Sequence, residues 1–517
     1  MISRRAFLKS SVSVLAGSIL APSIMASDRS ASPSGRPNVL FIMTDQQFAD
    51  AMSCRMGRQF IHTPAMDSLA VNGTVFTCAY TPNPLCMPAR NSLFTGRYPH
   101  ETGVTRNVAV KLDPVEFTCL GTYFRRAGYE TAYYGKWHLS FPQKDVDAHG
   151  FATPRGPTDK TQDQDARAAG DAARFIAQKH EKPFLLVVSL LNPHNICEYA
   201  RGQKLPCGPI GEAPVPEQCP PAPTNPAPPE NEPDTMTMMR RGYHASPMFP
   251  VGDFRPEKWR QLRWAYYRMI EKVDAEIGRV LHALRQAGLE EKTLIVSTSD
   301  HGECAGAHGF NQKTVFYEES VHVPLIVSHK GVTKQGSCDK MVNTGLDLLP
   351  TMLDFAGLET PRKLTGRSLK PLATGQSVAQ WRDHLVLENH MDQAAAVDGI
   401  RPSVQGRMVR TDPTRSGAAG RFKYCVYSQG VQRESLVDLQ ADPGETKNLA
   451  RDPGHRRVLL EHRALLAKFA QEHNDPLAAS LLANDVESRP FRDESQRAAR
   501  NARSPFRAFD LPIRCRG

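Results

Sequence analysis

The sequence predicts an α/β fold: a large mixed, mostly parallel sheet flanked by helices, with a smaller C-terminal antiparallel sheet plus helix. Strand-like and helix-like segments alternate as far as about residue 360, which is the pattern of a parallel sheet covered by helices. From about Pro361 the segments become shorter and are separated by turns such as Asp442-Pro443-Gly444, which indicates a second, antiparallel sheet.

Short apolar segments are the strands expected in the large sheet. Val39–Met43 is apolar without interruption, as expected of a strand buried on both faces. The expected strands are Val39–Met43, Thr131–Tyr134, Phe184–Leu191, Leu294–Thr298 and Val323–Ser328.

Two helices of this part have clear signals. Thr63 and Pro64 predict a helix start, with Thr63 as the cap and Pro64 in the first turn. Residues 256–286 predict a long helix, because apolar side chains recur there at helical spacing and are expected in the core. These side chains are Leu262, Tyr266, Ile270, Val273, Ile277, Val280, Leu281 and Leu284.

The remaining chain divides into an insertion, a subdomain and a tail. Residues about 200–250 are rich in Pro, Gly and Met and show no periodicity, so we expect a loop-like insertion over the active face. The predicted division is a catalytic domain over residues 28–360, a subdomain over 361–485 and an Arg-rich tail over 486–517. The segments expected in the subdomain are Leu385–Glu388, Met408–Arg410, Phe422–Tyr427, Glu434–Asp438 and a late helix at about 454–472.

The N-terminus predicts a targeting signal. The run Ser3-Arg4-Arg5-Ala6-Phe7-Leu8-Lys9 precedes a short apolar stretch, Val12–Ala21, and small residues near Ala26 and Ser27 offer a cleavage site. Paired arginines in this context predict a twin-arginine signal peptide over residues 1–27, and therefore a periplasmic or secreted protein that uses the twin-arginine export machinery. A short membrane anchor and an ordinary basic start are the competing interpretations. No run of about 18 apolar residues is present, so stable membrane insertion is not expected.

Charge and cysteine content constrain the partners only loosely. The formal net charge of +10 lies partly in the signal and partly in the tail, which we interpret as solvated rather than as an anion-binding arm. No nucleic-acid partner is expected, although a basic surface would attract polyanionic substrates. The 11 cysteines show no zinc-cluster spacing. If Cys86 is reserved for chemistry, an even number remains for disulfides in an oxidising compartment.

Polar residues of catalytic type follow the ends of four predicted strands. Ligands of open α/β sheets bind beyond the carboxyl ends of the strands, so we expect these residues to form one site. Asp45, Gln46, Asp300 and His301 together offer oxygen ligands and an imidazole, which suit a hard cation such as Ca²⁺ or Mg²⁺; each alone is as easily a capped turn or a surface charge. The segments are Thr44-Asp45-Gln46, Gly135-Lys136-Trp137-His138, Asn192-Pro193-His194 and Asp300-His301-Gly302.

The segment Cys86-Met87-Pro88-Ala89-Arg90 carries the sharpest local signal. Pro88 favours a helix start, which puts Cys86 at a helix N-terminus, where anions are stabilised and a thiol is easily activated. Arg90, one turn later, is able to hold an oxyanion by two hydrogen bonds. Out of context, a buried structural cysteine is the simpler interpretation.

This segment, with Thr95-Gly96-Arg97 behind it, resembles the signature of the formylglycine-dependent (type I) sulfatases, which belong to the alkaline phosphatase superfamily and share its fold. The resemblance covers nearly the whole chain after the signal, with the motifs in the family's order. The other matching segments are Asn38–Gln46, Gly135–His138, Asp300–Gly302, Lys313 with Phe316–Ser320, Asp438-Leu439 and Asp442–Leu449.

The resemblance implies a sulfuric ester hydrolase whose nucleophile derives from Cys86. A formylglycine-generating enzyme would oxidise Cys86 to 3-oxoalanine (formylglycine), and water would add to give a geminal diol. One hydroxyl would attack sulfur and displace the alcohol, and the other would then expel sulfate. Ca²⁺, with Mg²⁺ or Mn²⁺ as alternatives, would be held by Asp45, Gln46, Cys86, Asp300 and His301 and would stabilise the charge on the sulfuryl oxygens.

The resemblance also implies roles for basic residues of the site. Arg90 and Lys136 would steady the diol, and His138 would assist the nucleophile. His194, Lys313 and Lys136 would bind the sulfate group, and His194 would protonate the leaving oxygen. Alone, each lysine is as easily a surface residue and each histidine as easily a core residue.

One departure from the family leaves the reaction open. Many sulfatases carry two acidic residues where this chain has Asp45-Gln46, and related phosphonate monoester and phosphodiester hydrolases also combine Asp-Gln with a formylglycine. The first prediction is an exported sulfatase that acts on a sulfated carbohydrate, with Asn107 in contact with the substrate. The alternatives are a phosphonate monoester or phosphodiester hydrolase on the same scaffold and an inactive exported glycan-binding protein.

Overall fold

The computed structural model describes residues 35–108, 110–156, 163–412, 421–486 and 488–491. The predicted signal peptide, residues 1–27, and all of the predicted tail except residues 486 and 488–491 lie outside the described residues. Over the part of the chain that is described, no helix is both long and apolar enough to cross a membrane.

An eight-stranded sheet forms the centre of the larger part, in the order β5-β4-β6-β1-β7-β8-β2-β9. β1 pairs in parallel with both β6 and β7, whereas β8 is antiparallel to β7 and to β2. The predicted large mixed, mostly parallel sheet is therefore confirmed. Its strands are β1 (Asn38–Asp45), β2 (Thr74–Phe76), β4 (Glu130–Gly135), β5 (Thr153–Arg155), β6 (Phe184–Pro193), β7 (Thr293–Ser299), β8 (Leu325–Ser328) and β9 (Gly336–Cys338).

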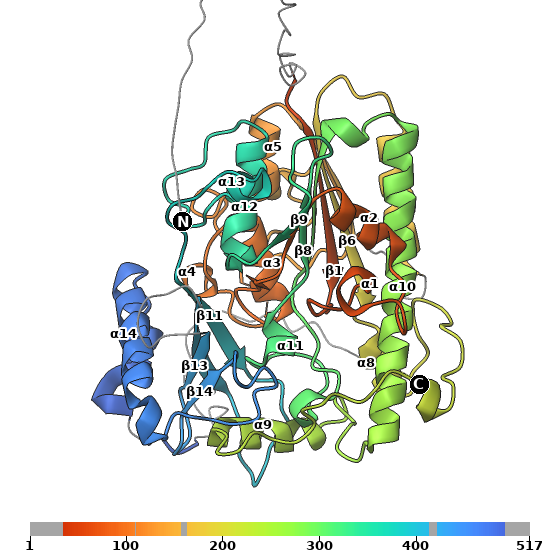
Figure 1. The fold of residues 1–517 in the computed structure, drawn as a ribbon. Coiled ribbons are helices and arrows are strands. Elements are labelled where there is room, and N and C mark those ends of the chain that lie inside the picture. Colours follow the sequence, from red (N-terminus) through yellow and green to blue (C-terminus); the bar gives the residue numbers. More distant parts are fainter. Residues whose placement is uncertain (1–34, 109, 157–162, 413–420, 487, 492–517) are drawn as a thin grey trace, which may run out of the picture. The chain divides into compact units, whose positions relative to one another are not determined.

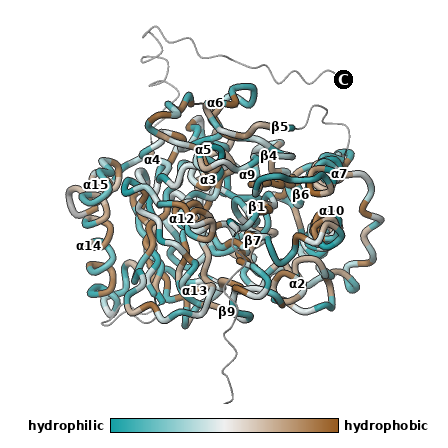
Figure 2. The backbone as a smooth tube through the Cα atoms, turned by 90° about the horizontal axis from the view of Figure 1, so that it is seen from above, coloured by the Kyte–Doolittle hydropathy of each residue, from teal (hydrophilic) through white to brown (hydrophobic). Residues whose placement is uncertain are grey.

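Helices cover both faces of this sheet (Figure 1; Figure 2). Alternate side chains of β1 point to opposite faces, so that Phe41 joins the core under α3, α5 and α12, while Ile42 joins the core under α2, α7 and α10. Both side chains are completely buried, which explains why the strand is apolar throughout. The helices are α2 (Pro64–Val71), α3 (Cys86–Thr95), α5 (Leu120–Arg126), α7 (Gln164–Ile176), α10 (Pro256–Gln286) and α12 (Thr344–Phe355).

The smaller part is a four-stranded antiparallel sheet in the order β11-β12-β13-β14, which confirms the predicted C-terminal sheet plus helix. A second helix, α15, follows the predicted one. The elements are β11 (His384–Met391), β12 (Val404–Thr411), β13 (Phe422–Tyr427), β14 (Glu434–Asp438), α14 (Arg456–Glu472) and α15 (Pro476–Leu482). The remaining short elements are α1 (Ser53–Met56), α4 (Pro99–Thr102), α6 (Val146–His149), α8 (Ile196–Ala200), α9 (Asp234–His244), α11 (Glu318–Val321), α13 (Lys370–Ala373), β3 (Ala79–Tyr80) and β10 (Val342–Asn343).

Three local predictions were wrong. Thr63 occupies the cap position of α2 but does not cap it, because its hydroxyl oxygen accepts from Ser53 N–H; Asp274 of α10 accepts from the first N–H groups instead. β8 starts at Leu325 rather than Val323, since Pro324 has no N–H to donate to a ladder. The insertion contains the helix α9, whose buried Met236, Met239 and Tyr243 are separated by polar residues.

The ten cysteines within the described ranges are all unpaired. Most of them are buried and pack as small apolar side chains. The disulfides considered from cysteine parity are therefore absent among these residues, and Cys515 lies outside the described residues.

Candidate active site

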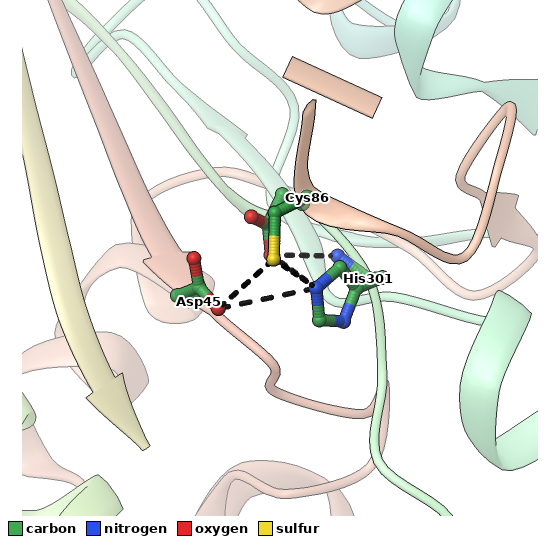
Figure 3. A group of neighbouring side chains, drawn as sticks. Asp45, Cys86 and His301 are labelled. Carbon is green, nitrogen blue, oxygen red and sulfur yellow. Dashed lines mark hydrogen bonds and ion pairs between the residues drawn. The ribbon is translucent and has the colours of Figure 1, made fainter. Parts of the chain in front are cut away.

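The tips of β1 and β7 meet the N-terminus of α3 at one buried point. Thr44 and Ser299 are paired in the parallel register of the two strands, so Asp45 and Asp300 follow side by side. Cys86 is the first residue of α3 and faces both strand tips together with His301 (Figure 3). These side chains are at most 1% exposed.

The side chains of this cluster lie close enough together to bind one metal ion. Cys86 Sγ lies 3.1 Å from His301 Nε2 and 3.9 Å from Asp45 Oδ1. His301 Nε2 lies 3.6 Å from Asp300 Oδ1. One ligand-type atom of each of the four residues lies within 4.8 Å of the others.

Arg90 orients both carboxylates from behind. Its Nη2 donates to Asp45 Oδ2 at 2.8 Å, its Nε donates to Asp300 Oδ2 at 2.7 Å, and its Nη1 donates to Ser189 Oγ at 2.7 Å. The guanidinium is thus occupied, contrary to the expectation that it is free to hold an oxyanion. It leaves one oxygen of each carboxylate, Oδ1, turned toward Cys86 and His301.

Two lysines bring positive charge to the cluster. Lys136 follows β4 and donates to Asp45 Oδ2 at 2.5 Å. Lys313 donates to the amide oxygen of Gln46 at 2.5 Å. Burial raises the pKa of the Cys86 thiol, but Lys136, Lys313 and His301 outweigh it and hold that pKa well below its usual range. The position of Cys86 Sγ therefore favours an anion.

His138 and His194 complete the group near Cys86. Burial lowers the pKa of both imidazoles, and the Lys313 and Lys136 cations bring that of His194 to about 4. His138 adopts φ 50° and has a buried Nδ1 without a hydrogen-bond partner. Both rings interact with Cys86 and are uncharged near neutral pH, so either is able to accept a proton.

Gln46 and Asn107 have hydrogen-bond partners of their own next to the cluster. The Gln46 amide donates to Glu303 Oε2 at 2.5 Å and accepts from Lys313, which makes it a link between these two residues. Asn107 accepts from the backbone N–H of Met87 at 3.0 Å and so braces the start of α3. Glu303 was missed by sequence reasoning, although it stands only two positions after His301 at the end of a predicted strand.

The chemistry of the cluster fits a divalent cation. Asp45 and Asp300 each present a carboxylate oxygen that Arg90 leaves open, and His301 presents Nε2. Carboxylate oxygens with one imidazole suit Ca²⁺, Mg²⁺ or Mn²⁺.

Comparison with known proteins identifies the relatives of this arrangement. The family model described as Sulfatase matches residues 37–358, and the model described as N-sulphoglucosamine sulphohydrolase, C-terminal, matches residues 306–472. The Delta 4,5-hexuronate-2-O-sulfatase of Bacteroides thetaiotaomicron is 29% identical over 453 residues, which cover 85% of this chain and 90% of that protein.

Solved structures share the fold across nearly the same span. A structure in complex with its substrate D-glucosamine-2-N,6-O-disulfate has a TM-score of 0.69 and 25% identity, and the match covers 85% of this chain and 99% of the other. The phosphonate monoester hydrolase of Agrobacterium radiobacter has a TM-score of 0.66 at 24% identity, with 85% of this chain and 96% of the other covered. At that identity the second likeness concerns the fold alone.

Proposed function

The chain belongs to the sulfatase family and is a sulfuric ester hydrolase; from this premise we propose that it cleaves sulfate esters of a sulfated carbohydrate with a nucleophile made from Cys86. The observation that carries the proposal is the position of Cys86 Sγ at the first residue of α3. It lies 3.1 Å from His301 Nε2, next to two buried carboxylates, buried Lys313 and partly buried Lys136.

The nucleophile is formylglycine, produced from Cys86 by a formylglycine-generating enzyme. Its hydrate carries two hydroxyls at the place of the thiol. One hydroxyl loses its proton to His138, which is uncharged, and attacks the sulfur atom while the bond from sulfur to the alcohol oxygen breaks. The second hydroxyl then loses its proton, the aldehyde forms again, and sulfate leaves.

The surrounding side chains stabilise charge, protonate the leaving group and position the carboxylates. Lys136 and Lys313 balance the charge of the sulfuryl oxygens. His194 protonates the leaving alcohol; its low pKa in the free site rises once an anionic sulfate group lies between it and the two lysines. Arg90 acts indirectly, because it fixes the carboxylates of Asp45 and Asp300.

A divalent cation belongs to this proposal, with Ca²⁺ as the first candidate and Mg²⁺ or Mn²⁺ as alternatives. Asp45, Asp300, His301 and the modified Cys86 would hold it, with Gln46 at its side. When bound, it supplies Lewis-acid stabilisation of charge on the sulfuryl group and on the nucleophile.

The substrate and the location are inferred from relatives and from the N-terminus. The relative is named as a hexuronate 2-O-sulfatase, and the substrate in the neighbouring structure is a sulfated sugar. Both support a sulfated glycan, such as a glycosaminoglycan fragment, as substrate here. Residues 1–27 support twin-arginine export to the periplasm or the medium. A catalytic domain over residues 28–360 and a subdomain over 361–485 remain the proposed division.

The second candidate is hydrolysis of phosphonate monoesters or phosphodiesters. The amide of Gln46 favours it, because it stands where many sulfatases carry a second acidic residue. The experiment compares kcat/KM for a sulfated monosaccharide, an aryl sulfate and an aryl phosphonate monoester with enzyme whose Cys86 peptide has been analysed by mass spectrometry. We expect an aldehyde at Cys86 and a preference for the sulfates. A preference for the phosphonate would replace the first candidate by the second, and a thiol at Cys86 in the active enzyme would contradict both.

A further inference from the structure

A large basic pocket opens beside the candidate active site. It has a volume of about 750 Å³ and is lined by residues of β4, β5, α7, α6 and the loop before α6. Among the described residues, its lining includes four cationic side chains and the carboxylate of Asp171. The charged residues of this basic pocket are Lys144, Arg155, Arg167, Arg174 and Asp171.

The basic pocket is continuous with the catalytic strand end. Gly135, the last residue of β4, lines it, and the next residue, Lys136, pairs with Asp45. Gly135 is tightly packed, since a Cβ built on it would lie 1.9 Å from the carbonyl oxygen of Ser189 and 3.3 Å from Cβ of Ala168 on α7. This wall therefore holds the pocket at a fixed place relative to Lys136.

The cations of the basic pocket are accessible to a ligand. The side chains of Arg155 and Arg174 are 66% and 70% exposed, while Asp171 is 10% exposed. Arg174 forms an ion pair with Asp171, and Arg155 lies 3.9 Å from the same carboxylate. Exposed pairs of this kind contribute little, and one carboxylate does not neutralise the two cations Arg155 and Arg174. Asp163 and Asp165, nearby on α7, accept from backbone N–H groups.

We propose that the basic pocket binds a second anionic group of the substrate, a sulfate or a carboxylate on a sugar unit adjacent to the one that is cleaved. This inference rests on the proposed function and deepens it, because it makes the substrate a glycan chain with several anionic groups. Arginine forks match the oxygens of sulfate and carboxylate groups. None of the described residues that line the pocket is aromatic, so the stacking platforms on which single-stranded nucleic acids depend are missing there.

The test measures binding without turnover. In a Cys86→Ala background, calorimetry gives the Kd of a sulfated heparin tetrasaccharide and of glucosamine 6-sulfate. The pocket variant is Lys144→Glu/Arg155→Glu, which leaves Arg174 to pair with Asp171. The matched control is Arg457→Glu/Lys468→Glu, two exposed cations of α14, which lies on the opposite side of the molecule from β5 and α7 (Figure 2).

We expect the pocket variant to bind the tetrasaccharide roughly tenfold more weakly and the monosaccharide within about twofold of the parent, with a difference that shrinks at high salt. The control should leave both Kd values unchanged. The proposal is overturned if the tetrasaccharide binds equally well to the pocket variant, if the control weakens binding as much, or if single-stranded DNA of the same charge binds the pocket as tightly.

Two further measurements distinguish failure of this proposal from misfolding of a variant and from failure of the proposed function. Lys144→Gln/Arg155→Gln removes the charges without reversing them and should give a smaller loss of affinity in the same direction, which provides the answer if the Glu variant does not fold. Sulfate release from an aryl sulfate by enzyme with intact Cys86 tests the proposed function alone. If no sulfate is released but tetrasaccharide binding still depends on Lys144 and Arg155, the proposed function is contradicted, whereas the role of the basic pocket in binding anions is supported.

Discussion

Cys86 Sγ lies 3.1 Å from Nε2 of His301, although 215 positions separate the two residues in the chain. One residue begins a helix and the other follows a strand of the central sheet, and their contact is what the crossover connections of an α/β fold produce at the carboxyl ends of its strands.

Removing the Arg90 guanidinium should destabilise the protein strongly. Arg90→Ala leaves the buried carboxylates of Asp45 and Asp300 without their shared partner, which costs about 3–5 kcal/mol in the free energy of unfolding. Urea unfolding measures this loss. The control is Arg125→Ala, which removes an exposed pair with Asp147 and should cost at most about 1 kcal/mol. Equal losses of unfolding free energy in the two variants would show that the buried ion pairs stabilise the protein no more than an exposed one.

The amide of Gln46 should be required for its donor hydrogens. Gln46→Glu places a carboxylate against Glu303 Oε2, where the amide now donates at 2.5 Å, and should cost about 2–4 kcal/mol. The double variant Gln46→Glu/Glu303→Gln exchanges donor and acceptor and should recover most of the lost stability. A double variant as unstable as the sum of the two single variants would contradict this assignment.

A methyl group at Gly135 should disturb Lys136. Gly135 has φ +104°, and a Cβ there would lie 1.9 Å from the carbonyl oxygen of Ser189, so Gly135→Ala must shift the end of β4. We expect kcat to fall by about 10²-fold. Gly128→Ala is the matched control, because Gly128 also has positive φ but open space around it; its kcat should be unchanged.

The ion pair between His100 and Glu388 should make stability depend on pH. Burial opposes the charged imidazole, but the hydrogen bond and charge of Glu388 prevail and raise the pKa of His100 from 6.5 to about 9. A raised pKa means that the stabilisation is fully present below about pH 6.5 and is lost as pH rises through about 9. The urea midpoint of the wild type should therefore fall between pH 7 and 10 by more than that of His100→Asn. Parallel pH profiles would exclude this pair as the cause.

Removal of the cation should be visible without substrate. A chelator should lower both the sulfate release and the melting temperature, because the bound ion stabilises the folded state by mass action. Re-addition of Ca²⁺, Mg²⁺ or Mn²⁺ should restore both and rank the ions. The melting temperature of Asp300→Asn should not change with the chelator. If the melting temperature of the wild type is also unchanged by the chelator, no metal is bound at this site.

Sequence patterns predicted the parts of this molecule that depend on local periodicity. The strands β1 and β6 are largely apolar because helices cover both faces. The residues at the strand ends were expected to meet because ligands of open α/β sheets bind beyond the carboxyl ends of the strands. The partners of Arg90, by contrast, lie 45 and 210 positions away, and no local pattern indicates that its guanidinium serves two carboxylates. The helix α9 and the capping of α2 by Asp274 were missed because contacts distant in sequence decide both.

The measurement that tests the central claim most directly is sulfate release from a sulfated monosaccharide by wild type and by Cys86→Ala, both produced with a formylglycine-generating enzyme. We predict release by the wild type and none above background by a folded Cys86→Ala protein. Undiminished release by that variant would contradict the assignment of Cys86 as the source of the nucleophile.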